Sequence, residues 1–468
     1  MAHPAEYVKK YQFFHSIFDG QSVDIKVRGI REDSMDDPVL FPVGDCKPAP
    51  MPIPGKPRLL LPERDQVEVQ YEHLNALIPL DHPVRVVWGF VEGSDLSVLN
   101  DAIRATEDRP GRPAIDPRVL LALWLYATLD GIGSARALEK LCDDHLVYRW
   151  IRGGVPLNYH TLSDFRGTLG ECLDDLLTEM VATLLSKNLV TLNRVAHDGV
   201  RVRANAGTGS FRKGETLSKC LAEAQAQVEA LKAELHADPG ASDKRRKAAV
   251  ERAARERVAK IKAALEQYPD IKKKKKDDKE NARASTTDAT ARPMRMADGG
   301  SRPAYNLQVA TDPVAQVVLD VDVSQSGSDE GQLKPAYKRL RKRYKKAVGE
   351  MLVDGGFSKK KDIEDLGEEG CTVYAPVPKH KAAEKKKRVR RDRLDGPHVA
   401  AWRKRMESDE AKSIYRIRAQ TECVHAHWRN RGLYQLPVRG KEKVKAVALL
   451  HAVAHNILRM AKLMKKAG

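Results

Sequence analysis

The sequence predicts an α/β protein: a mixed sheet with helices on both faces, an all-helical region before it and a helical insertion within it. Three observations support this fold class. Residues 67–190 show helical periodicity of their apolar side chains. From Leu192 onward, short apolar strands alternate with helices, as they do in mixed α/β sheets. Residues 216–268 repeat apolar side chains at spacings of four and three, which indicates two antiparallel helices.

The composition favours a polyanionic partner. The chain has 468 residues, a length suited to two or three domains. Its formal net charge of +18 favours nucleic acid as that partner. A basic soluble protein without such a partner is the alternative.

Other classes of protein are disfavoured. The six cysteines are scattered without a C-x-x-C pair, so neither a zinc ribbon nor a disulfide scaffold is indicated. The N-terminus, M-A-H-P-A-E-Y-V-K-K, lacks the apolar run of a signal peptide. The longest apolar run, which begins at Val119, is shorter than the roughly 20 residues of a membrane span. We therefore expect a cytoplasmic protein without a membrane partner.

The chain before the sheet divides into two predicted parts. Residues 1–64 form a leader and a proline-rich linker, C-K-P-A-P-M-P-I-P-G-K-P, expected to be partly disordered. Residues 65–190 form a helical N-terminal domain, which is a candidate for DNA binding because such domains often place a helix in the major groove.

Capping residues mark the helices of this N-terminal domain. We expect Asp116 to cap one helix, with Pro117 in its first turn, and Ser134 to cap the next. A further helix is expected at 158–166, with Thr161 or Ser163 as its cap.

The predicted sheet domain comprises residues 191–215 and 281–468, and a helical hairpin with a basic tract, 216–280, interrupts it. V-T-L-N-R-V-A-H-D-G-V-R-V-R-A-N-A alternates apolar and polar residues and continues through a glycine, as two strands of a hairpin would. Y-N-L-Q-V-A-T-D and Q-V-V-L-D-V-D-V-S predict a second pair of strands. A basic helix follows, with Ser328 or Asp329 as its expected cap.

Two basic runs, at 338–346 and 385–393, are interpreted as surfaces that contact phosphates. A solvated run of charge is the alternative for each of them.

Two aspartates stand where apolar strands are expected to end. Asp198 follows V-A-H, Asp354 follows M-L-V, and a glycine comes after each of them, so a ligand could approach closely. Glu422 lies on a helix that could cover the same edge. Taken singly, each Asp-Gly is typical of a turn, and Glu422 of a solvated helix residue. Jointly, the three carboxylates suit phosphodiester chemistry with two Mg²⁺ ions.

The segment Y-R-I-R-A-Q-T-E-C-V-H-A-H-W-R near the C-terminus carries Glu422. Tyr415, Arg418 and Glu422 are spaced i, i+3 and i+7, which puts them on one face of a helix. His425 and His427 point to different sides of such a helix, which disfavours a zinc site. His425 is instead expected on the polar face or at DNA.

These segments resemble the insertion-sequence transposases of the DDE class, whose catalytic domain is RNase H-like. Tyr415, Arg418, Glu422 and Arg429 match the family's Y-(2)-R-(3)-E-(6)-K signature, with arginine in place of the final lysine. H-D-G-V-R-V-R-A-N-A resembles the block around the family's first aspartate, and L-V-D-G-G-F the block around the second. G-R-P-A-I-D-P-R-V-L-L-A-L-W-L-Y-A-T-L-D-G-I-G-S resembles its N-terminal helical domain. The likeness extends over residues 65–465.

The resemblance implies an RNase H-like core with the catalytic and metal-binding triad Asp198, Asp354 and Glu422. The implied cofactor is Mg²⁺, for which Mn²⁺ can substitute. The implied reaction is phosphodiester hydrolysis at the transposon ends, followed by strand transfer into target DNA.

The resemblance also implies the partners. Tyr415, Arg418 and Arg429 would lie near the transposon-end inverted-repeat DNA, and target DNA would bind as well. Because two transposon ends must be paired, we expect a homodimer or higher oligomer on DNA. When bound to DNA, the protein would be associated with the nucleoid.

Two other functions stay open: a nuclease on the same fold, and a non-catalytic DNA-binding protein derived from a transposase. The three carboxylates disfavour the second, because binding alone does not need them.

Other polar residues are weaker candidates. His197 could orient Asp198, although an ordinary strand position is favoured. Asn306 and Gln308 could face the substrate or only the sheet surface. Asp320 and Asp322 rank below the triad because they lie within a strand and no glycine follows either.

Overall fold

The computed structural model describes residues 73–101, 103, 113–237, 244–275, 279–378 and 395–467. The chain divides into two compact units, 1–70 and 71–468, and the described residues all belong to the second. The predicted leader and linker, 1–64, and the basic run at 385–393 lie outside the described residues.

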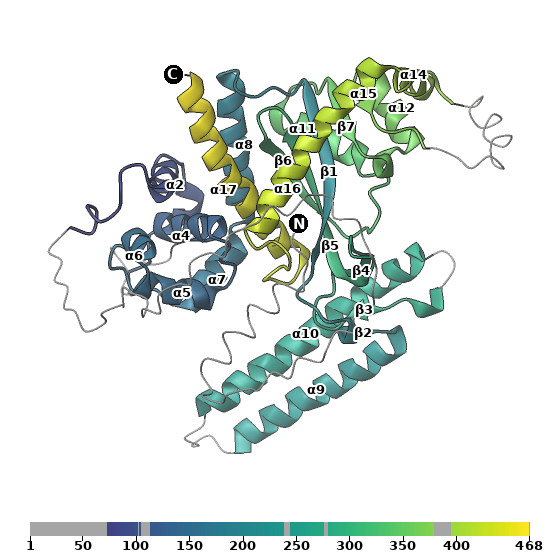
Figure 1. Cartoon of the computed structure of the whole chain (residues 1–468). Coiled ribbons are helices and arrows are strands. Elements are labelled where there is room, and N and C mark those ends of the chain that lie inside the picture. The colour runs from purple at the N-terminus through teal and green to yellow at the C-terminus, as the bar shows by residue number, and fades with distance from the viewer. Residues whose placement is uncertain are drawn as a thin grey trace, which may run out of the picture. The chain divides into compact units, whose positions relative to one another are not determined.

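A group of helices precedes the sheet (Figure 1). They are α2 Pro83–Glu92, α3 Ser97–Asp101, α4 Pro117–Leu129, α5 Ala135–Asp144, α6 Leu146–Arg152, α7 Tyr159–Thr168 and α8 Gly170–Ser186. Asp116 and Ser134 cap α4 and α5 as predicted, since each side chain accepts a hydrogen bond from a backbone N–H of the first turn.

The cap of α7 differs from the prediction. Asn158 accepts the backbone N–H of Thr161 at 2.9 Å, so neither Thr161 nor Ser163 is the cap. Asparagine caps as well as serine does, and Asn158 still has extended backbone while Thr161 already lies within the helix.

The sheet is mixed, as predicted, and its strand order is consistent with an RNase H-like core. Its strands are β1 Arg194–Arg203, β4 Arg292–Arg295, β5 Ser301–Asp312, β6 Val317–Ser324, β7 Glu350–Val353 and β8 Thr372–Tyr374. β1 lies between β5, which is antiparallel to it, and β7, which is parallel to it. β8 continues the parallel side, while β4 and β6 pair with the other edge of β5.

β1 is one continuous strand, so the prediction of two strands of a hairpin here was wrong. It runs through Gly199 because that residue keeps extended pairing with Gln308 of β5. The last pair between β1 and β7 joins His197 to Val353. Asp198 therefore does not end its own strand; it lies where the neighbouring strand ends, and from there on β1 has no β7 partner.

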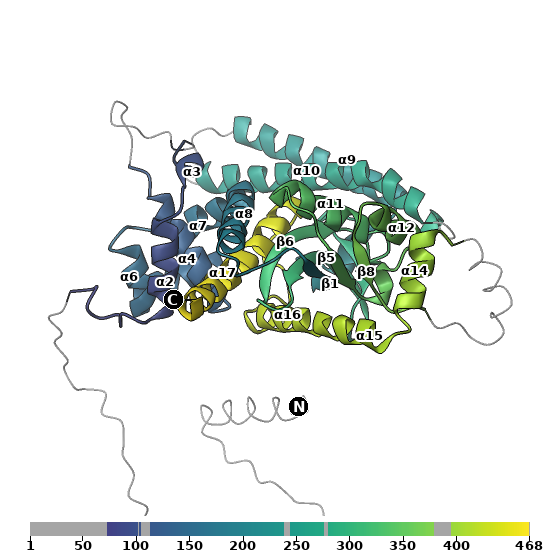
Figure 2. The same cartoon turned by 90° about the horizontal axis from the view of Figure 1, so that it is seen from above.

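Helices cover both faces of the sheet, as Figure 2 shows. One face carries α11 Leu333–Tyr344 and α12 Lys360–Glu368, and α14 Pro397–Arg405 packs against α12. The other face carries α15 Asp409–Arg416 and α16 Gln420–Asn430, which a 3-10 turn, Ile417–Ala419, joins.

The insertion is a helical hairpin of α9 Gly214–Ala237 and α10 Lys244–Lys274. The ion pair Lys247–Glu234 at 3.2 Å, near one end of the hairpin, indicates that the two helices are antiparallel, as predicted. Two short strands, β2 Phe211–Arg212 and β3 Ala284–Ser285, pair where the chain enters and leaves the hairpin. The hairpin has a small apolar cluster of its own, around Leu217, Ala264 and Ala284.

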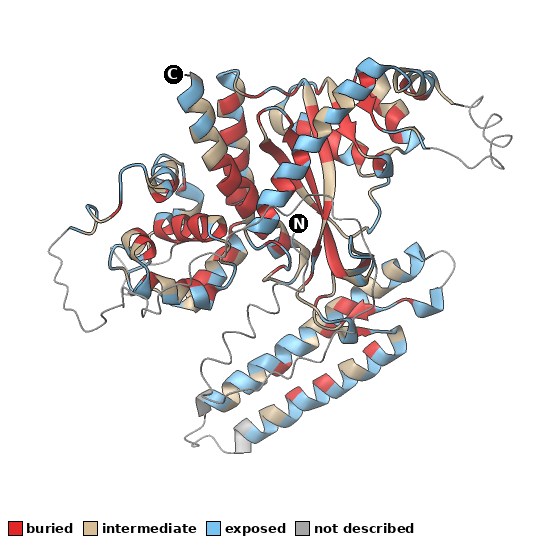
Figure 3. Ribbon diagram, viewed as in Figure 1, coloured by how far each residue is buried: buried red, intermediate tan, exposed pale blue. Residues whose placement is uncertain are grey.

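The C-terminal helix α17, Lys441–Ala467, packs against α8, α4 and β6. Asn456 ties it to β6: its side-chain oxygen accepts the backbone N–H of Val318 at 2.9 Å, and its amide donates to the carbonyl of Val318 at 2.8 Å. Figure 3 shows the buried faces of α4, α8 and α17 turned toward the interior. A single hydrophobic core therefore runs from the N-terminal helices into the sheet.

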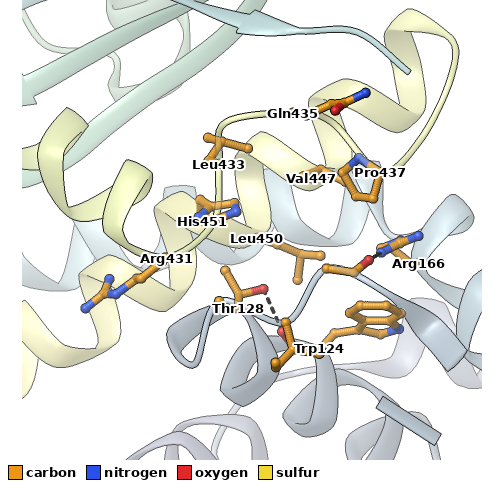
Figure 4. Close-up of a pocket in the computed structure, with 14 residues that line it drawn as sticks. Trp124, Thr128, Arg166, Arg431, Leu433, Gln435, Pro437, Val447, Leu450 and His451 are labelled. Atoms are coloured by element: carbon orange, nitrogen blue, oxygen red, sulfur yellow. Dashed lines mark hydrogen bonds between the residues drawn. The ribbon is translucent and has the colours of Figure 1, made fainter. Parts of the chain in front are cut away.

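A second contact joins the N-terminal helices to the segment after α16. Gly131 and Gly432 both have positive φ, and a Cβ on Gly432 would lie 2.9 Å from the carbonyl oxygen of Gly131. Beside them, a cavity of about 60 Å³ is lined by Arg166 and Trp124 (Figure 4). The guanidinium of Arg166 lies 4.2 Å from the Trp124 ring centre and donates to the carbonyl of Gly133.

No described helix is both long and apolar enough to cross a lipid bilayer.

Candidate active site

Asp198 lies on the face of β1 that α16 covers. Its Oδ2 atom is 3.3 Å from Nη1 of Arg418 and 3.7 Å from Nδ1 of His425. Its Oδ1 atom accepts the backbone N–H of Gly199 at 2.9 Å. The side chain is 16% exposed, so this carboxylate is mostly buried yet reachable.

Burial raises the pKa of Asp198 to about 6, and the negative charges of Asp354 and Asp329 add to this rise. The nearby guanidinium of Arg418 opposes it. At neutral pH Asp198 is therefore ionised, and its negative charge is only partly compensated. A site of this kind attracts a further cation.

Asp354 follows β7 directly, as predicted. Its Oδ1 atom accepts the backbone N–H of Gly356 at 2.7 Å and thereby caps the 3-10 turn Gly355–Phe357. Because His197 and Val353 are partners in parallel strands, the residues that follow them, Asp198 and Asp354, start from adjacent positions. The pairing thus brings the two predicted aspartates together at the open edge of β1.

Arg418 links the other predicted residues of the site. It lies in the 3-10 turn between α15 and α16, and its guanidinium is 5.8 Å from the ring centre of Tyr415. Its Nη2 atom is 3.3 Å from Oε1 of Glu422, whose side chain is 63% exposed. The guanidinium therefore lies between the carboxylates of Asp198 and Glu422 and separates them.

Arg429 lines a cleft of about 580 Å³ that begins where β7 ends. Its other lining residues are Gly199, Val200, Arg201, Arg203, Met296, Ala297, Asp298, Asp329, Asp354, Leu433 and Tyr434. Arg201 and Arg203 were missed as site residues, although V-R-V-R directly after H-D-G places them on one face by the period of two. The cleft thus brings together three aspartates, Asp298, Asp329 and Asp354, and three arginines.

His425 is buried, so the expectation that it lies on the polar face or at DNA was wrong. It belongs to the inner face of α16, together with Trp428. Burial lowers the pKa of His425 to about 4, with Arg429 and Arg418 contributing, so the imidazole beside Asp198 is neutral. His427 points elsewhere, and its ring lies 5.6 Å from that of His455.

His197 lies on the opposite side of β1 from Asp198. Its Nε2 atom is 2.9 Å from Oε1 of Gln308, and its ring meets Phe357 edge-on. Gln308 and Asn306 are buried rather than open on the sheet surface.

Asp320 and Asp322 have structural partners on α11. Asp320 is fully buried and pairs with Arg339 at 2.7 Å and Arg343 at 3.2 Å. Asp322 pairs with Arg339 at 3.1 Å. Both aspartates therefore serve to hold α11 against the sheet.

Asp198 and Asp354 offer the hard oxygen ligands that divalent cations prefer. Within the described ranges, no three or more His, Cys, Asp or Glu side chains already stand together as a metal-binding group. Glu422 is held outward by Arg418. The two aspartates fit a divalent ion by the chemistry of their oxygens, whereas the Glu422 carboxylate is directed toward Arg418 and solvent.

The fold defines an RNase H-like protein, and comparisons with known families narrow this class. Residues 72–168 match the model described as Transposase domain (DUF772), and residues 278–457 match the model described as Transposase DDE domain. The second range includes Asp354 and Glu422, while Asp198 lies between the two. No curated protein and no solved structure gives a match. The chain belongs to the insertion-sequence transposases of the DDE class, enzymes that act on DNA and generally use a divalent metal.

Proposed function

We propose that this transposase hydrolyses a phosphodiester bond at each end of its element and then joins the freed 3′-hydroxyl to target DNA. The proximity of Asp198 and Asp354 at an open strand edge, beside an arginine-lined cleft, is the observation that supports this most. Carboxylates attract a metal ion, and arginines attract phosphate. The site thus has both kinds of group that position and stabilise a phosphoryl transfer.

Asp198, Asp354 and Glu422 are the residues that would hold Mg²⁺, or Mn²⁺ in its place. When bound, the ion supplies Lewis acidity for activating water and for neutralising charge on the phosphate. Burial, and after it the negative charge of Asp354, raises the pKa of Asp198, and a nearby divalent cation would offset both effects. Glu422 would join once Arg418 releases it.

The same release gives Arg418 a role toward DNA. A guanidinium freed from the two carboxylates can bind a phosphate through two parallel hydrogen bonds. Tyr415, which packs against Arg418, can bond a phosphate or stack on an unpaired base. Arg429 would bind the backbone from the wall of the cleft.

The partners are the transposon-end inverted repeats and a target duplex. Each active site acts on one end, so pairing two ends requires at least a homodimer on DNA. The N-terminal helices and the exposed lysines of the basic run at 338–346 are candidates for additional phosphate contacts. Arg339 and Arg343 of that run pair with aspartates instead.

Cleavage of a labelled duplex that carries the element's own terminal repeat tests the proposal. Wild type, Asp354→Asn and the control Asp322→Asn would be compared in Mg²⁺ and in EDTA. Asp322 suits as the control because it lies on β6, two strands away from Asp198, and pairs with Arg339 of α11. We expect cleavage at the repeat boundary that requires Mg²⁺, persists in the control, and falls at least about a thousandfold in Asp354→Asn.

The products separate the other functions. Joined strands identify a transposase, whereas cut ends that never join identify a nuclease. Tight binding without cleavage, identical in wild type and Asp354→Asn, would show a non-catalytic DNA-binding protein and refute the proposal.

A further inference from the structure

A fourth carboxylate, that of Asp329, lies close to Gly199 and Gly356, on the face of β1 opposite to Asp198. The sequence predicted Ser328 or Asp329 as the cap of α11, and neither is the cap: α11 begins at Leu333, and the preceding residue, Gln332, makes no side-chain cap. Asp329 instead belongs to the loop between β6 and α11, and its side chain is only 12% exposed. It turns inward, toward β5 and β1.

Two buried amides of β5 hold Asp329. Its Oδ1 atom accepts hydrogen bonds from Nδ2 of Asn306 at 2.6 Å and from Nε2 of Gln308 at 3.0 Å. Gln308 is oriented in turn, because its own oxygen is bound to His197. Both amide side chains are almost fully buried, so the position of Asp329 is closely fixed.

The second oxygen of Asp329 has a looser partner. Oδ2 lies 3.6 Å from Nη2 of Arg201, which is longer than a hydrogen bond. A carboxylate this far from water is costly when its charge is incompletely paired. Two amide donors would be satisfied equally well by the oxygen of an asparagine, so holding the loop does not by itself require the charge.

Asp329 also touches the segments that carry both aspartates. A Cβ on Gly199, directly after Asp198, would lie 2.4 Å from Oδ1 of Asp329. A Cβ on Gly356 would lie 3.7 Å from the Cβ of Asp329, and the N–H of Gly356 binds Asp354. Asp329 thus lies between the two aspartate-bearing segments.

We propose that Asp329 is a positioning residue of the metal site. Locked on Asn306 and Gln308, it sets the spacing between Asp198 and Asp354, and its charge strengthens the attraction of the site for a divalent cation. The inference rests on the proposed function, since it concerns the same metal ion. It assigns Asp329 no contact with substrate.

Binding of Mn²⁺ to the full-length chain, followed by the electron paramagnetic resonance of the free ion and without any DNA reaction, tests this role. We expect Asp329→Asn to weaken binding about 10- to 100-fold, the range typical of residues that orient metal ligands. Thermal unfolding in EDTA should stay close to that of wild type, because asparagine is isosteric and still accepts from the two amides.

Two reference variants make the result decisive. Asp143→Asn removes the same charge from the N-terminal helices, where Asp143 pairs with Arg152, and should bind Mn²⁺ like wild type. Asp198→Asn removes a proposed ligand and should lose binding. If Asp198→Asn loses binding while Asp329→Asn binds like wild type, Asp329 is only a loop anchor and the inference is refuted.

A different set of binding results would show that the proposed metal site itself is wrong. If wild type binds no Mn²⁺, or if Asp198→Asn binds as wild type does, the proposed metal site is wrong and this inference falls with it. If Asp329→Asn unfolds early, Asn306→Ser decides instead, because it loosens Asp329 while keeping the charge. Weaker binding with unchanged unfolding supports the role, and unchanged binding refutes it.

Discussion

At Gly199 the backbone of β1 lies very close to the side chains of Asp329, Asn306 and Gln308. A side chain there would meet three atoms at once: Oδ1 of Asp329 at 2.4 Å, Oδ1 of Asn306 at 2.8 Å and Nε2 of Gln308 at 2.9 Å. Gly199 is extended and pairs normally with β5, so space rather than backbone conformation requires glycine. The glycine after Asp198 therefore marks a close approach and not the turn that the dipeptide suggests.

Gly199→Ala adds one methyl group at this position and so tests whether the space is as tight as the structure shows. We expect the free energy of unfolding to fall by about 1–3 kcal/mol, as in other overpacked sites, because the hydrogen-bonded side chains must move. Gly207→Ala is a matched control, since nothing lies within 4 Å of the added Cβ and its φ of −80° suits alanine. Equal unfolding midpoints in urea for both variants would contradict the close approach.

The sequence was enough to identify the candidate aspartates of the site, but it did not show which side chains surround them. Asp198 and Asp354 stand out because each follows a mainly apolar run of residues and precedes a glycine. Asp329 does not stand out, because S-D-E-G before a helix is typical of a cap. Its partners on β5 become visible only when the strand register is known. The burial of His425 depends equally on which face of α16 meets the sheet.

Asn456 is one of the residues that hold α17 against β6. It satisfies both backbone groups of Val318 and is itself fully buried. These backbone groups would otherwise be an unpaired strand edge inside the core.

Asn456→Ala should therefore lower the free energy of unfolding by about 2–5 kcal/mol, because a donor and an acceptor are left buried without partners. Asn430→Ala, at the exposed end of α16, is the control and should change it by less than about 0.5 kcal/mol. Chemical denaturation followed by circular dichroism measures both. A loss below 1 kcal/mol in Asn456→Ala would show that the edge is satisfied in another way.

Many elements could be predicted from periodicity: the hairpin helices, β5, β6 and the basic helix α11 stand where the sequence placed them, whereas β3, β4 and α14 were not predicted. The wrong prediction at β1 has a physical cause. Alternation continues through Gly199 without a change of period, so the sequence cannot distinguish one long strand from two short ones. Only the pairing with β5 over the whole of β1 decides the matter.

At the scale of the whole molecule, buried histidines govern the response to acid. Burial lowers the pKa of four of them, to about 3 for His197 and His451 and about 4 for His425 and His455. The unfolded chain takes up these protons near pH 6.5, while the folded protein does not. The free energy of unfolding therefore falls as the pH drops below 6.5.

Each histidine contributes about 1.4 kcal/mol per pH unit to this loss until the pH nears its folded pKa. Asp198 acts in the opposite direction between about pH 6 and 4, because its raised pKa makes the folded state bind that proton first. Four groups outweigh one, so urea denaturation at fixed ionic strength should show lower stability at pH 5.0 than at pH 7.5. His451→Gln should make this dependence shallower. Equal stability of wild type at both pH values would rule out neutral buried histidines.

The pairing of β2 with β3 holds the two ends of the helical hairpin together, so the hairpin is a self-contained insertion. Phe211 and Arg212 pair with Ser285 and Ala284, so the points of entry and exit lie side by side. A short turn could join them without rerouting the sheet, which is the geometry that permits insertion and deletion. The same junction could accept a foreign hairpin, so the element between these two strands could be exchanged while β1, with Asp198, stays where it is.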